Sequence, residues 1–319
     1  PMIITVSPNT ALDRTRIVSG FQPGKQSRST LEFVQPGGSG THAAYVIQEL
    51  GGHTISIGPC GGHVGEYWKA EAEKLGLRVD MVPIPGETRE SICLVDLDLG
   101  TVVESVVAGP SVPPDTKDHM LERVKHYLPD AELLIVSGSV PPGIPADIYC
   151  EMIELARKFE IRTLADIHSE PLKLAIGHRP WLIKPNLVEF EDLLGFKTAG
   201  MAERIRESRK LSDEYGTIVA LSMAGEGLLL TYSGQQVFLT APAVDMHLPG
   251  GKGKNFTGCG DALVGGLAFE YCRSNDLVSA ARLGLAAAHF NLSTFGTPEI
   301  DAAQVIRLAE DVMVQRLPS

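Results

Sequence analysis

Short apolar segments alternate with longer segments in which apolar residues recur every three or four positions. An apolar segment at 133–136 is followed by an amphipathic segment at 146–159 and a second apolar segment at 163–166. Short apolar segments are typical of buried strands, and the longer segments of helices that cover a sheet. The same order recurs with apolar segments at 181–183 and 218–221 and predicted helices at 187–194 and 201–215. The alternation predicts an α/β fold, a mostly parallel sheet flanked by helices on both faces.

Two stretches, near 15–35 and 88–107, depart from this pattern because apolar and polar residues alternate without a helix between them. Residues 91–97 are typical of a half-buried strand, and residues 98–100 of a turn. We expect the two stretches to form a small separate sheet. A sheet of this kind would suit a lid, which excludes water from a reaction site.

Charge and cysteine content exclude several classes of protein. A formal net charge of -11 argues against a general binder of nucleic acid or anionic membranes, although it leaves room for a nucleotide ligand. The five cysteines are scattered and lack metal-ligand spacing, so we expect reduced thiols. The beginning of the sequence predicts a strand and not a signal peptide, and no apolar run approaches the roughly 20 residues that span a bilayer. Together these features predict a cytoplasmic protein.

Three glycine clusters, at 37–40, 61–65 and 258–260, precede predicted helices. Glycines before a helix let the backbone approach a ligand, and the free N–H groups with the helix dipole favour an anion. A tight turn alone explains any one of the clusters. Neither a Walker A pattern nor a dinucleotide-binding fingerprint is present. The long Ala- and Leu-rich segment 261–293, which contains three glycines, predicts closely packed helices.

Two groups of residues suggest chemistry. Asp261 directly follows the third glycine cluster, where it either complements the helix dipole or acts as a base beside an anion hole; phosphoryl transfer needs both a base and an anion hole. Asn186 and Glu189 have the spacing of a capping box, which alone explains the pair. The same two polar groups would also suit a Mg²⁺-bound phosphate, with water between them and the ion.

Six motifs follow one another in an order that resembles the ribokinase-like, or pfkB, carbohydrate kinases over nearly the whole chain. They are Thr5-Val6-Ser7-Pro8-Asn9-Thr10-Ala11-Leu12-Asp13, Gly37-Gly38-x-Gly40, Val136-Ser137-Gly138-Ser139-Val140-Pro141-Pro142-Gly143, Lys184-Pro185-Asn186-x-x-Glu189, Leu221-Ser222-x-x-Gly225-x-Gly227 and Gly258-Cys259-Gly260-Asp261. Within that family the chain is most similar to the 1-phosphofructokinase and tagatose-6-phosphate kinase branch, which phosphorylates an already phosphorylated sugar.

The resemblance implies an ATP- and Mg²⁺-dependent carbohydrate kinase, with one ribokinase-like domain over residues 1–319. It implies that insertions at about 13–36 and 87–108 form a β-sheet lid, which in relatives often makes a dimer contact. It assigns the catalytic base to Asp261 and an anion hole to the amides of Gly258, Cys259 and Gly260. Asn186 and Glu189 would organise Mg²⁺ and the ATP phosphates, Glu189 through water.

Further residues receive roles at the two ends of the implied site. Ser222, Gly225 and Gly227 would line the nucleotide site. Asp13, Gly37 and Gly38 would hold sugar hydroxyls, and a carboxylate suits this task because it accepts bonds from two hydroxyl groups.

The sequence departs from the pattern of that branch where the sugar should bind. The branch has Gly-Gly-Lys-Gly-x-Asn, whereas this chain has Ser39 in place of the lysine and His42 in place of the asparagine. His42 can donate a hydrogen bond to the substrate or, when protonated, supply charge, and it is equally consistent with a helix-turn histidine. Arg28 and Arg89 remain as candidate partners of a sugar phosphate, or as solvated surface arginines.

Two other departures concern the nucleotide side. Cys259 stands where the family has alanine, and a helix N-terminus predicts a lowered thiol pKa and easier oxidation. The loop 250–254 is longer and more basic than usual, which would put Lys252 or Lys254 near ATP phosphates if it is not simply a flexible loop.

These features together predict transfer of the ATP γ-phosphoryl group to a sugar hydroxyl, most simply that of a ketohexose phosphate. The alternatives are a kinase for an unphosphorylated sugar, sugar acid or nucleoside, favoured by Ser39, and a sugar- or nucleotide-binding regulator without turnover. Joint presence of Asp261, Asn186 and Glu189 argues against the regulator.

Overall fold

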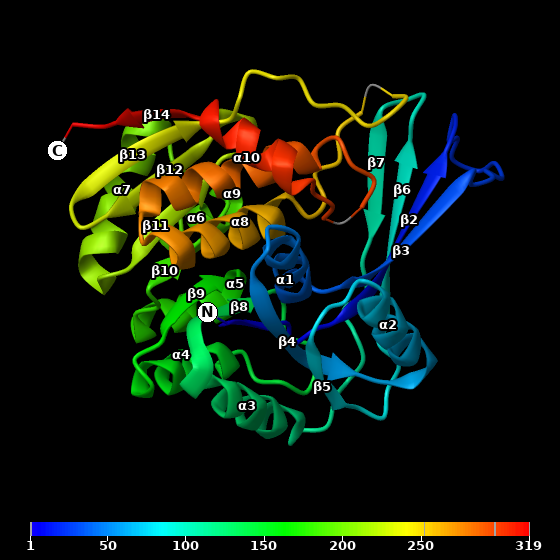
Figure 1. The fold of residues 1–319 in the computed structure, drawn as a ribbon, viewed down its shortest axis with the longest axis horizontal. Helices are drawn as coiled ribbons and strands as arrows, with labels where there is room; N and C mark the ends of the chain where they lie inside the picture. Colours follow the sequence, from blue (N-terminus) through cyan, green and yellow to red (C-terminus); the bar gives the residue numbers. More distant parts are fainter. Residues whose placement is uncertain (1, 252, 297, 319) are drawn as a thin grey trace.

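A ten-stranded sheet forms the centre of the molecule (Figure 1). The computed structural model describes residues 2–251, 253–296 and 298–318. The sheet order is β14-β13-β12-β11-β10-β9-β8-β1-β4-β5. The parallel strands are β1 (Met2–Val6), β4 (His53–Cys60), β5 (Val79–Pro83), β8 (Ala131–Ser137), β9 (Arg162–Asp166), β10 (Leu182–Ile183) and β11 (Ile218–Ser222). The predicted mostly parallel α/β sheet is confirmed.

One edge of this sheet is antiparallel, which the sequence patterns did not predict. It consists of β12 (Leu228–Tyr232), β13 (Gln235–Thr240) and β14 (Met313–Arg316). The turn between β12 and β13 is Ser233-Gly234, and both residues have positive φ, 46° and 73°. Two-residue hairpin loops of this kind match the twist of the flanking strands and favour glycine.

Helices cover both faces of the main sheet. One face carries α3 (Thr116–Tyr127), α4 (Ile148–Lys158), α5 (Ser169–Ala175), α6 (Leu187–Leu194) and α7 (Met201–Tyr215). The other face carries α1 (Ser39–Glu49), α8 (Cys259–Ser274), α9 (Leu277–Asn291) and α10 (Ala302–Glu310). Among the described residues, no helix has both the length and the apolar character needed to cross a membrane.

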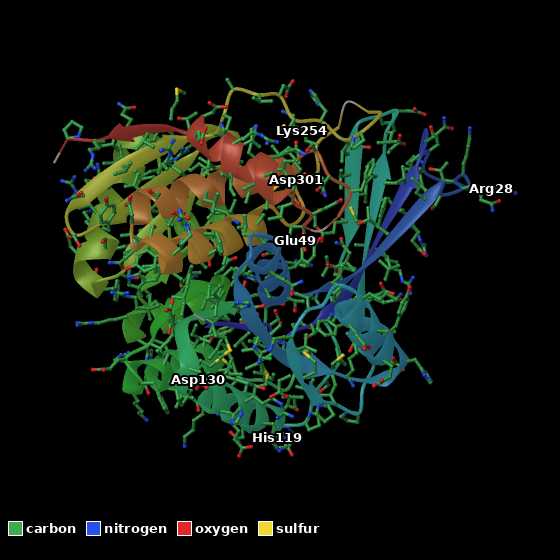
Figure 2. The ribbon with its side chains drawn as sticks, viewed as in Figure 1. Arg28, Glu49, His119, Asp130, Lys254 and Asp301 are labelled. Atoms are coloured by element: carbon green, nitrogen blue, oxygen red, sulfur yellow. The ribbon has the colours of Figure 1, made fainter. Side chains whose placement is uncertain are left out.

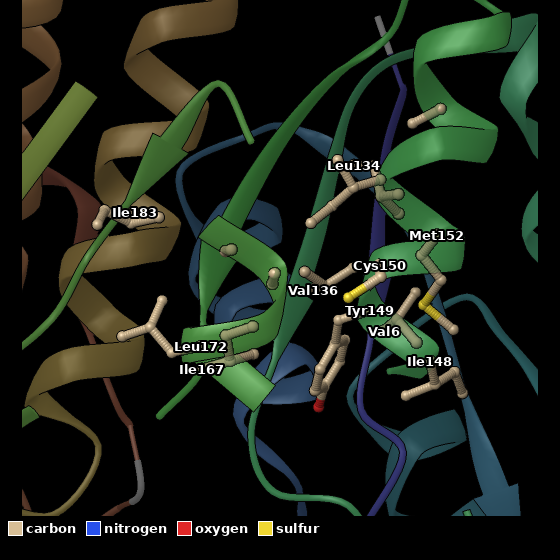
Figure 3. Close-up of a cluster of buried hydrophobic side chains, with 14 of the residues drawn as sticks. Val6, Leu134, Val136, Ile148, Tyr149, Cys150, Met152, Ile167, Leu172 and Ile183 are labelled. Carbon is tan, nitrogen blue, oxygen red and sulfur yellow. The ribbon is translucent and has the colours of Figure 1, made fainter. Parts of the chain in front are cut away.

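The alternating side chains of β8 divide the apolar core into two layers. Leu133 and Ile135 face α1 and α8, whereas Leu134 and Val136 face α4 and α5. Figure 3 shows the second layer, where side chains of α4 lie against Val136. In that layer the Tyr149 hydroxyl donates to the Gly138 carbonyl at 2.8 Å, which fixes the segment that follows β8.

A separate four-stranded sheet stands beside the main body, at the right of Figure 1. It contains β2 (Ala11–Val18), β3 (Leu31–Gly37), β6 (Arg89–Asp96) and β7 (Thr101–Ser105), in the order β3-β2-β6-β7. The predicted small sheet is therefore confirmed. Each hairpin is antiparallel, but the two hairpins join through parallel pairing of β2 with β6. Helix α2 (Gly62–Lys74) packs beside this sheet, with Trp68 against Leu12.

Candidate active site

A cavity of about 300 Å³ lies where β8, β9 and β10 end, next to the small sheet. Ligands bind at this edge in open α/β sheets because the loops that follow parallel strands converge there. The cavity is lined mainly by polar residues: Ser7, Asn9, Ser39, Arg89, Val106, Ser137, Gly138, Ser139, Asp166, His168, Lys184, Asn186, Glu189, Gly260 and Asp261. A groove of about 350 Å³ between α3 and α4 contains none of the predicted site residues.

The three glycine clusters differ in what their amides contact. At the N-terminus of α1, the amides of Gly40 and Thr41 donate to Ser7 Oγ at 2.8 and 3.2 Å. At the N-terminus of α2, the Glu87 carboxylate accepts from the amides of His63 and Val64 at 3.1 and 3.0 Å. Side chains of the chain itself therefore occupy these two helix N-termini.

The third cluster brings Asp261 to the cavity. Gly258, with φ of 80°, is the N-cap of α8, and Asp261 lies in the first turn. Gly260 and Asp261 line the cavity, whereas Gly258 and Cys259 do not, and the Cys259 amide donates to the Phe256 carbonyl at 3.3 Å. Of the three amides predicted to form an anion hole, that of Gly260 belongs to a cavity-lining residue.

The prediction for the Cys259 thiol was wrong. Burial raises the pKa of Cys259 to about 11, although the Asn291 side chain donates a hydrogen bond to the sulfur at 3.4 Å. The thiol also lies 3.4 Å from the Asn255 carbonyl. The cost of removing the thiolate from water raises the pKa of Cys259 by more than the N-terminus of α8 could lower it.

Asn186 and Glu189 form the predicted capping box at the start of α6. The Glu189 amide donates to Asn186 Oδ1 at 3.0 Å, and the Asn186 amide donates to Glu189 Oε2 at 2.8 Å. Both residues also line the cavity. The capping interpretation is therefore confirmed, and it orients the same two side chains toward the space where a ligand would lie.

A buried ion pair at the ends of β9 and β10 was missed by the sequence reasoning. Lys184 Nζ lies 3.0 Å from Asp166 Oδ1, and the lysine side chain is 5% exposed. Burial raises the pKa of Asp166 to about 7 against the attraction of Lys184. Burial alone would lower the pKa of Lys184, but Asp166, Glu189 and Asp261 together raise it, so the lysine stays charged. The signal was Lys184 itself, directly before the capping box.

On the sugar side, His42 bridges two carboxylates. Its Nε2 lies 2.7 Å from Asp13 Oδ2, and its Nδ1 lies 2.6 Å from Asp261 Oδ2. His42 is not among the cavity-lining residues. The expectation that His42 contacts the substrate is therefore corrected, because both ring nitrogens are already bonded within the chain.

The packing of α1 on α8 explains this meeting. His42 and Val46 are four residues apart and share one face of α1, as Asp261 and Gly265 do on α8. A Cβ atom added at Gly265 would lie 2.6 Å from Val46 Cβ, so only glycine permits this separation of the helices. The close contact places His42 directly opposite Asp261.

Of the other residues predicted to bind the sugar, some lie against Asp13 and some line the cavity. Gly37 lies against Asp13, where a Cβ atom would come within 2.3 Å of Asp13 Oδ2. Gly38, with φ of 112°, is the N-cap of α1, and Ser39 and Arg89 line the cavity. Arg89 donates to the carbonyl oxygens of Asn9 at 3.0 Å and Val107 at 2.9 Å.

Arg28 lies away from the site. It is exposed on the connection between β2 and β3, at the outer edge of the small sheet in Figure 2, and it does not line the cavity. Within one chain, its predicted contact with a sugar phosphate has no support. Lys254 pairs with Asp245 at 2.7 Å, and Lys252 lies outside the described residues.

The residues predicted to line the nucleotide site, Ser222, Gly225 and Gly227, are not among the cavity-lining residues. Ser222 pairs with Asn186 in an isolated parallel bridge. Gly225 is exposed in a short 3₁₀ segment, Ala224–Glu226. Gly227 has φ of 125°, and a Cβ atom there would lie 2.2 Å from the Leu239 carbonyl oxygen. The fold therefore requires glycine at this position, whether or not a nucleotide binds beside it.

Comparison with known proteins assigns the chain to a family. The model of the pfkB family of carbohydrate kinases matches residues 9–302. The 1-phosphofructokinase of Bacillus subtilis is 28% identical, covering 99% of this chain and 100% of that protein. The tagatose-6-phosphate kinase of Staphylococcus epidermidis is 27% identical over 84% of each chain. Phosphofructokinase-2 from Escherichia coli, crystallised with substrates and products, superposes with a TM-score of 0.89 at 24% identity, covering 97% of this chain and 99% of that chain, so the two share a fold. The chain belongs to the pfkB family of carbohydrate kinases.

Proposed function

We propose that the protein transfers the γ-phosphoryl group of ATP to a hydroxyl group of a ketohexose phosphate, in a Mg²⁺-dependent reaction. The observation that carries the proposal is the position of Asp261. Its carboxylate lines the cavity at the N-terminus of α8, together with Lys184, Asn186 and Glu189. A base, a buried cation and helix N-terminal amides at one cavity are what phosphoryl transfer to a hydroxyl requires.

In this reaction Asp261 accepts the proton of the sugar hydroxyl. The hydroxyl oxygen forms a bond to the γ-phosphorus, the bond from that phosphorus to its bridging oxygen breaks, and the electron pair leaves with ADP. Lys184 and the Gly260 amide stabilise the negative charge on the transferred group. These two groups are close, because a Cβ atom added at Gly260 would lie 3.5 Å from Lys184 Nζ.

The residues near Asn186 suit a Mg²⁺ ion that arrives with ATP. Asp166, Asn186 and Glu189 offer hard oxygen donors at the cavity. The described His, Cys, Asp and Glu residues form no cluster of three or more that could hold a metal ion by themselves. That donor set fits an ion that keeps mostly water and phosphate ligands. We assign Glu189 and Asn186 to hold it through water, where it would neutralise phosphate charge, with Ser222, Gly225 and Gly227 beside the nucleotide.

A phosphorylated substrate is supported by Arg89. This arginine lines the cavity, and its described hydrogen bonds go to carbonyl oxygens. Asp13 and Glu104 interact with it electrostatically but make no described hydrogen bond to it, so its guanidinium group can still bind a phosphate. Relatives named 1-phosphofructokinase and tagatose-6-phosphate kinase support the same class. Ser39 at the cavity favours the second candidate, a kinase for an unphosphorylated sugar, sugar acid or nucleoside.

A coupled assay with Mg·ATP against phosphosugars, free sugars, sugar acids and nucleosides tests this proposal. We expect turnover with a ketohexose phosphate and a fall in kcat of at least ~10²-fold in Asp261→Asn, with ATP binding nearly unchanged. Asp192→Asn, which removes an exposed carboxylate paired with Lys173, is the matched control. Wild-type turnover by Asp261→Asn would refute the base, and ATP binding without turnover on any substrate would support a regulator.

We also propose a cytoplasmic location and a homodimer formed through the small sheet. The five cysteines are free thiols, which fits a reducing compartment. Exposed Val103 on β7, 52% accessible, supports an interface on this sheet.

A further inference from the structure

The bridge through His42 connects three elements that are far apart in the sequence. His42 comes from α1, Asp13 from β2 and Asp261 from α8. The three side chains are 8%, 12% and 15% exposed, so water contributes little to their solvation. Polar groups removed from water in this way depend on one another for hydrogen bonds.

The geometry of the bridge defines the protonation of the imidazole. A neutral imidazole has one N–H donor and one lone pair, and the lone pair would face a carboxylate that has only acceptors. When both carboxyl groups are ionised, bonds from both ring nitrogens therefore require the doubly protonated cation. In agreement, the bonds to Asp13 and Asp261 outweigh burial and raise the pKa of His42 to about 10.

We propose that His42 is a positioning residue for the base: it holds Oδ2 of Asp261 so that Oδ1 is left for the substrate hydroxyl, and it fixes the base relative to Asp13 on the sugar side. This inference rests on the proposed role of Asp261. His42 keeps both of its protons throughout, and the hydroxyl proton stays on Asp261. Neither ring nitrogen is left to contact the sugar.

The surrounding charges indicate a second effect of the same residue. The charged groups that interact electrostatically with this cluster are Glu104 on β7, Arg89 on β6, Asp166 at the end of β9 and Lys184 after β10. The thiols of Cys93 on β6 and Cys259 on α8 also face it. Without His42, the carboxylates of Asp13 and Asp261 would lie close together with no cation between them. Like charges raise one another's pKa, whereas an adjacent cation favours the ionised form. His42 therefore places a positive charge between the two carboxylates.

The variants His42→Asn and His42→Ala test this inference. An asparagine has only one donor nitrogen and cannot span the two carboxylates as the imidazolium does. We expect kcat to fall roughly 10- to 100-fold, as for a base displaced by about 1 Å. We also expect the acid limb of the kcat profile to move upward, since the neighbouring cation is lost.

His178→Asn is the matched control, because it removes an exposed histidine that pairs with Glu154 at 2.8 Å, away from the cavity. It should leave both kcat and the pH profile unchanged. A His42→Asn enzyme that is folded by thermal melting and keeps the wild-type kcat and acid limb would overturn the inference. If Asp261→Asn turns over normally, the proposed role of Asp261 as the base fails instead, whatever the His42 variants do.

A readout without turnover keeps the inference testable if the His42 variants do not fold. In ¹⁵N-histidine-labelled wild-type protein at pH 8, both ring nitrogens of His42 should give the shifts of protonated nitrogen. The Asp261→Asn variant should change the Nδ1 signal and identify the residue. A neutral His42 ring at pH 8 would overturn the proposed arrangement.

Discussion

At the scale of single residues, the buried charges of the site are arranged in two compensated groups. One is Asp13 with His42 and Asp261, and the other is Asp166 with Lys184. Removing one member of a buried pair leaves an uncompensated charge, which costs several kcal/mol. The cavity-facing Arg89 differs, because its described hydrogen bonds go to carbonyl oxygens, although Asp13 and Glu104 interact with it electrostatically.

Arg89→Ala should raise KM for a phosphosugar about 10- to 100-fold, because charge-assisted hydrogen bonds contribute about 1.5–3 kcal/mol. KM for the dephosphorylated analogue should change little. Steady-state kinetics on both substrates measures the difference, with Arg123→Ala as control, since Arg123 pairs with Asp80 away from the cavity. Equal rises for the two substrates would mean that no phosphate binds at Arg89.

At the scale of elements, the contact between α1 and α8 determines whether the base and its partner meet. Gly265 meets Val46 at this contact, and Gly266 meets Gly284 between α8 and α9, where an added Cβ would lie 2.9 Å from the Gly284 Cα. The Gly-containing segment 261–293 predicted closely packed helices, and the structure confirms them. The sequence did not predict that α8 packs against α1, because this contact joins segments that are far apart in the chain.

Gly265→Ala should therefore lower both stability and activity. The added methyl group overpacks the contact and should cost about 1–3 kcal/mol of unfolding free energy. It should also lower kcat by separating His42 from Asp261. Urea unfolding and steady-state kinetics measure the two effects. Gly177→Ala is the control, because nothing lies within 4 Å of an added Cβ there. Wild-type values for Gly265→Ala would contradict the tight contact.

The sequence was most informative where a pattern is local. The helix ranges 187–194 and 201–215 match α6 and α7, and the capping box of Asn186 and Glu189 has its predicted bonds. The antiparallel edge was missed because β12 is as apolar and buried as a parallel strand, and because β14 is short and exposed. The Ser233-Gly234 turn was the available signal. The bridge through His42 could not be predicted, because its three residues meet only in the folded chain.

At the scale of the whole molecule, the cavity lies between the ten-stranded main sheet and the small four-stranded sheet. The main sheet and its helices supply Asp166, Lys184 and Asp261, and the small sheet with its flanking segments supplies Arg89 and Val106. A site divided in this way can exclude water if the two parts approach each other. That the small sheet acts as a lid is our proposal.

A homodimer through the small sheet predicts a specific effect of Val103→Asp. On β7, Val103 pairs with Leu94 of β6 and is more than half exposed. A carboxylate there would be buried unpaired in an interface, so the variant should sediment as a monomer where the wild type forms a dimer. Ile306→Asp on α10 is the control. A wild-type dimer in Val103→Asp would place the interface elsewhere.

The parallel pairing of β2 with β6 has a consequence for the order of folding. Each hairpin of the small sheet is local, but Arg14 pairs with Ile92, and α1, β4, α2 and β5 lie between them in the chain. Closing so long a loop costs entropy, and contacts distant in sequence form slowly. We therefore expect the hairpins to form early and to join late, once the intervening segment has folded. Arg89, the residue proposed to bind the substrate phosphate, is the first residue of β6. A refolding chain should therefore regain its helices before it can bind a phosphate.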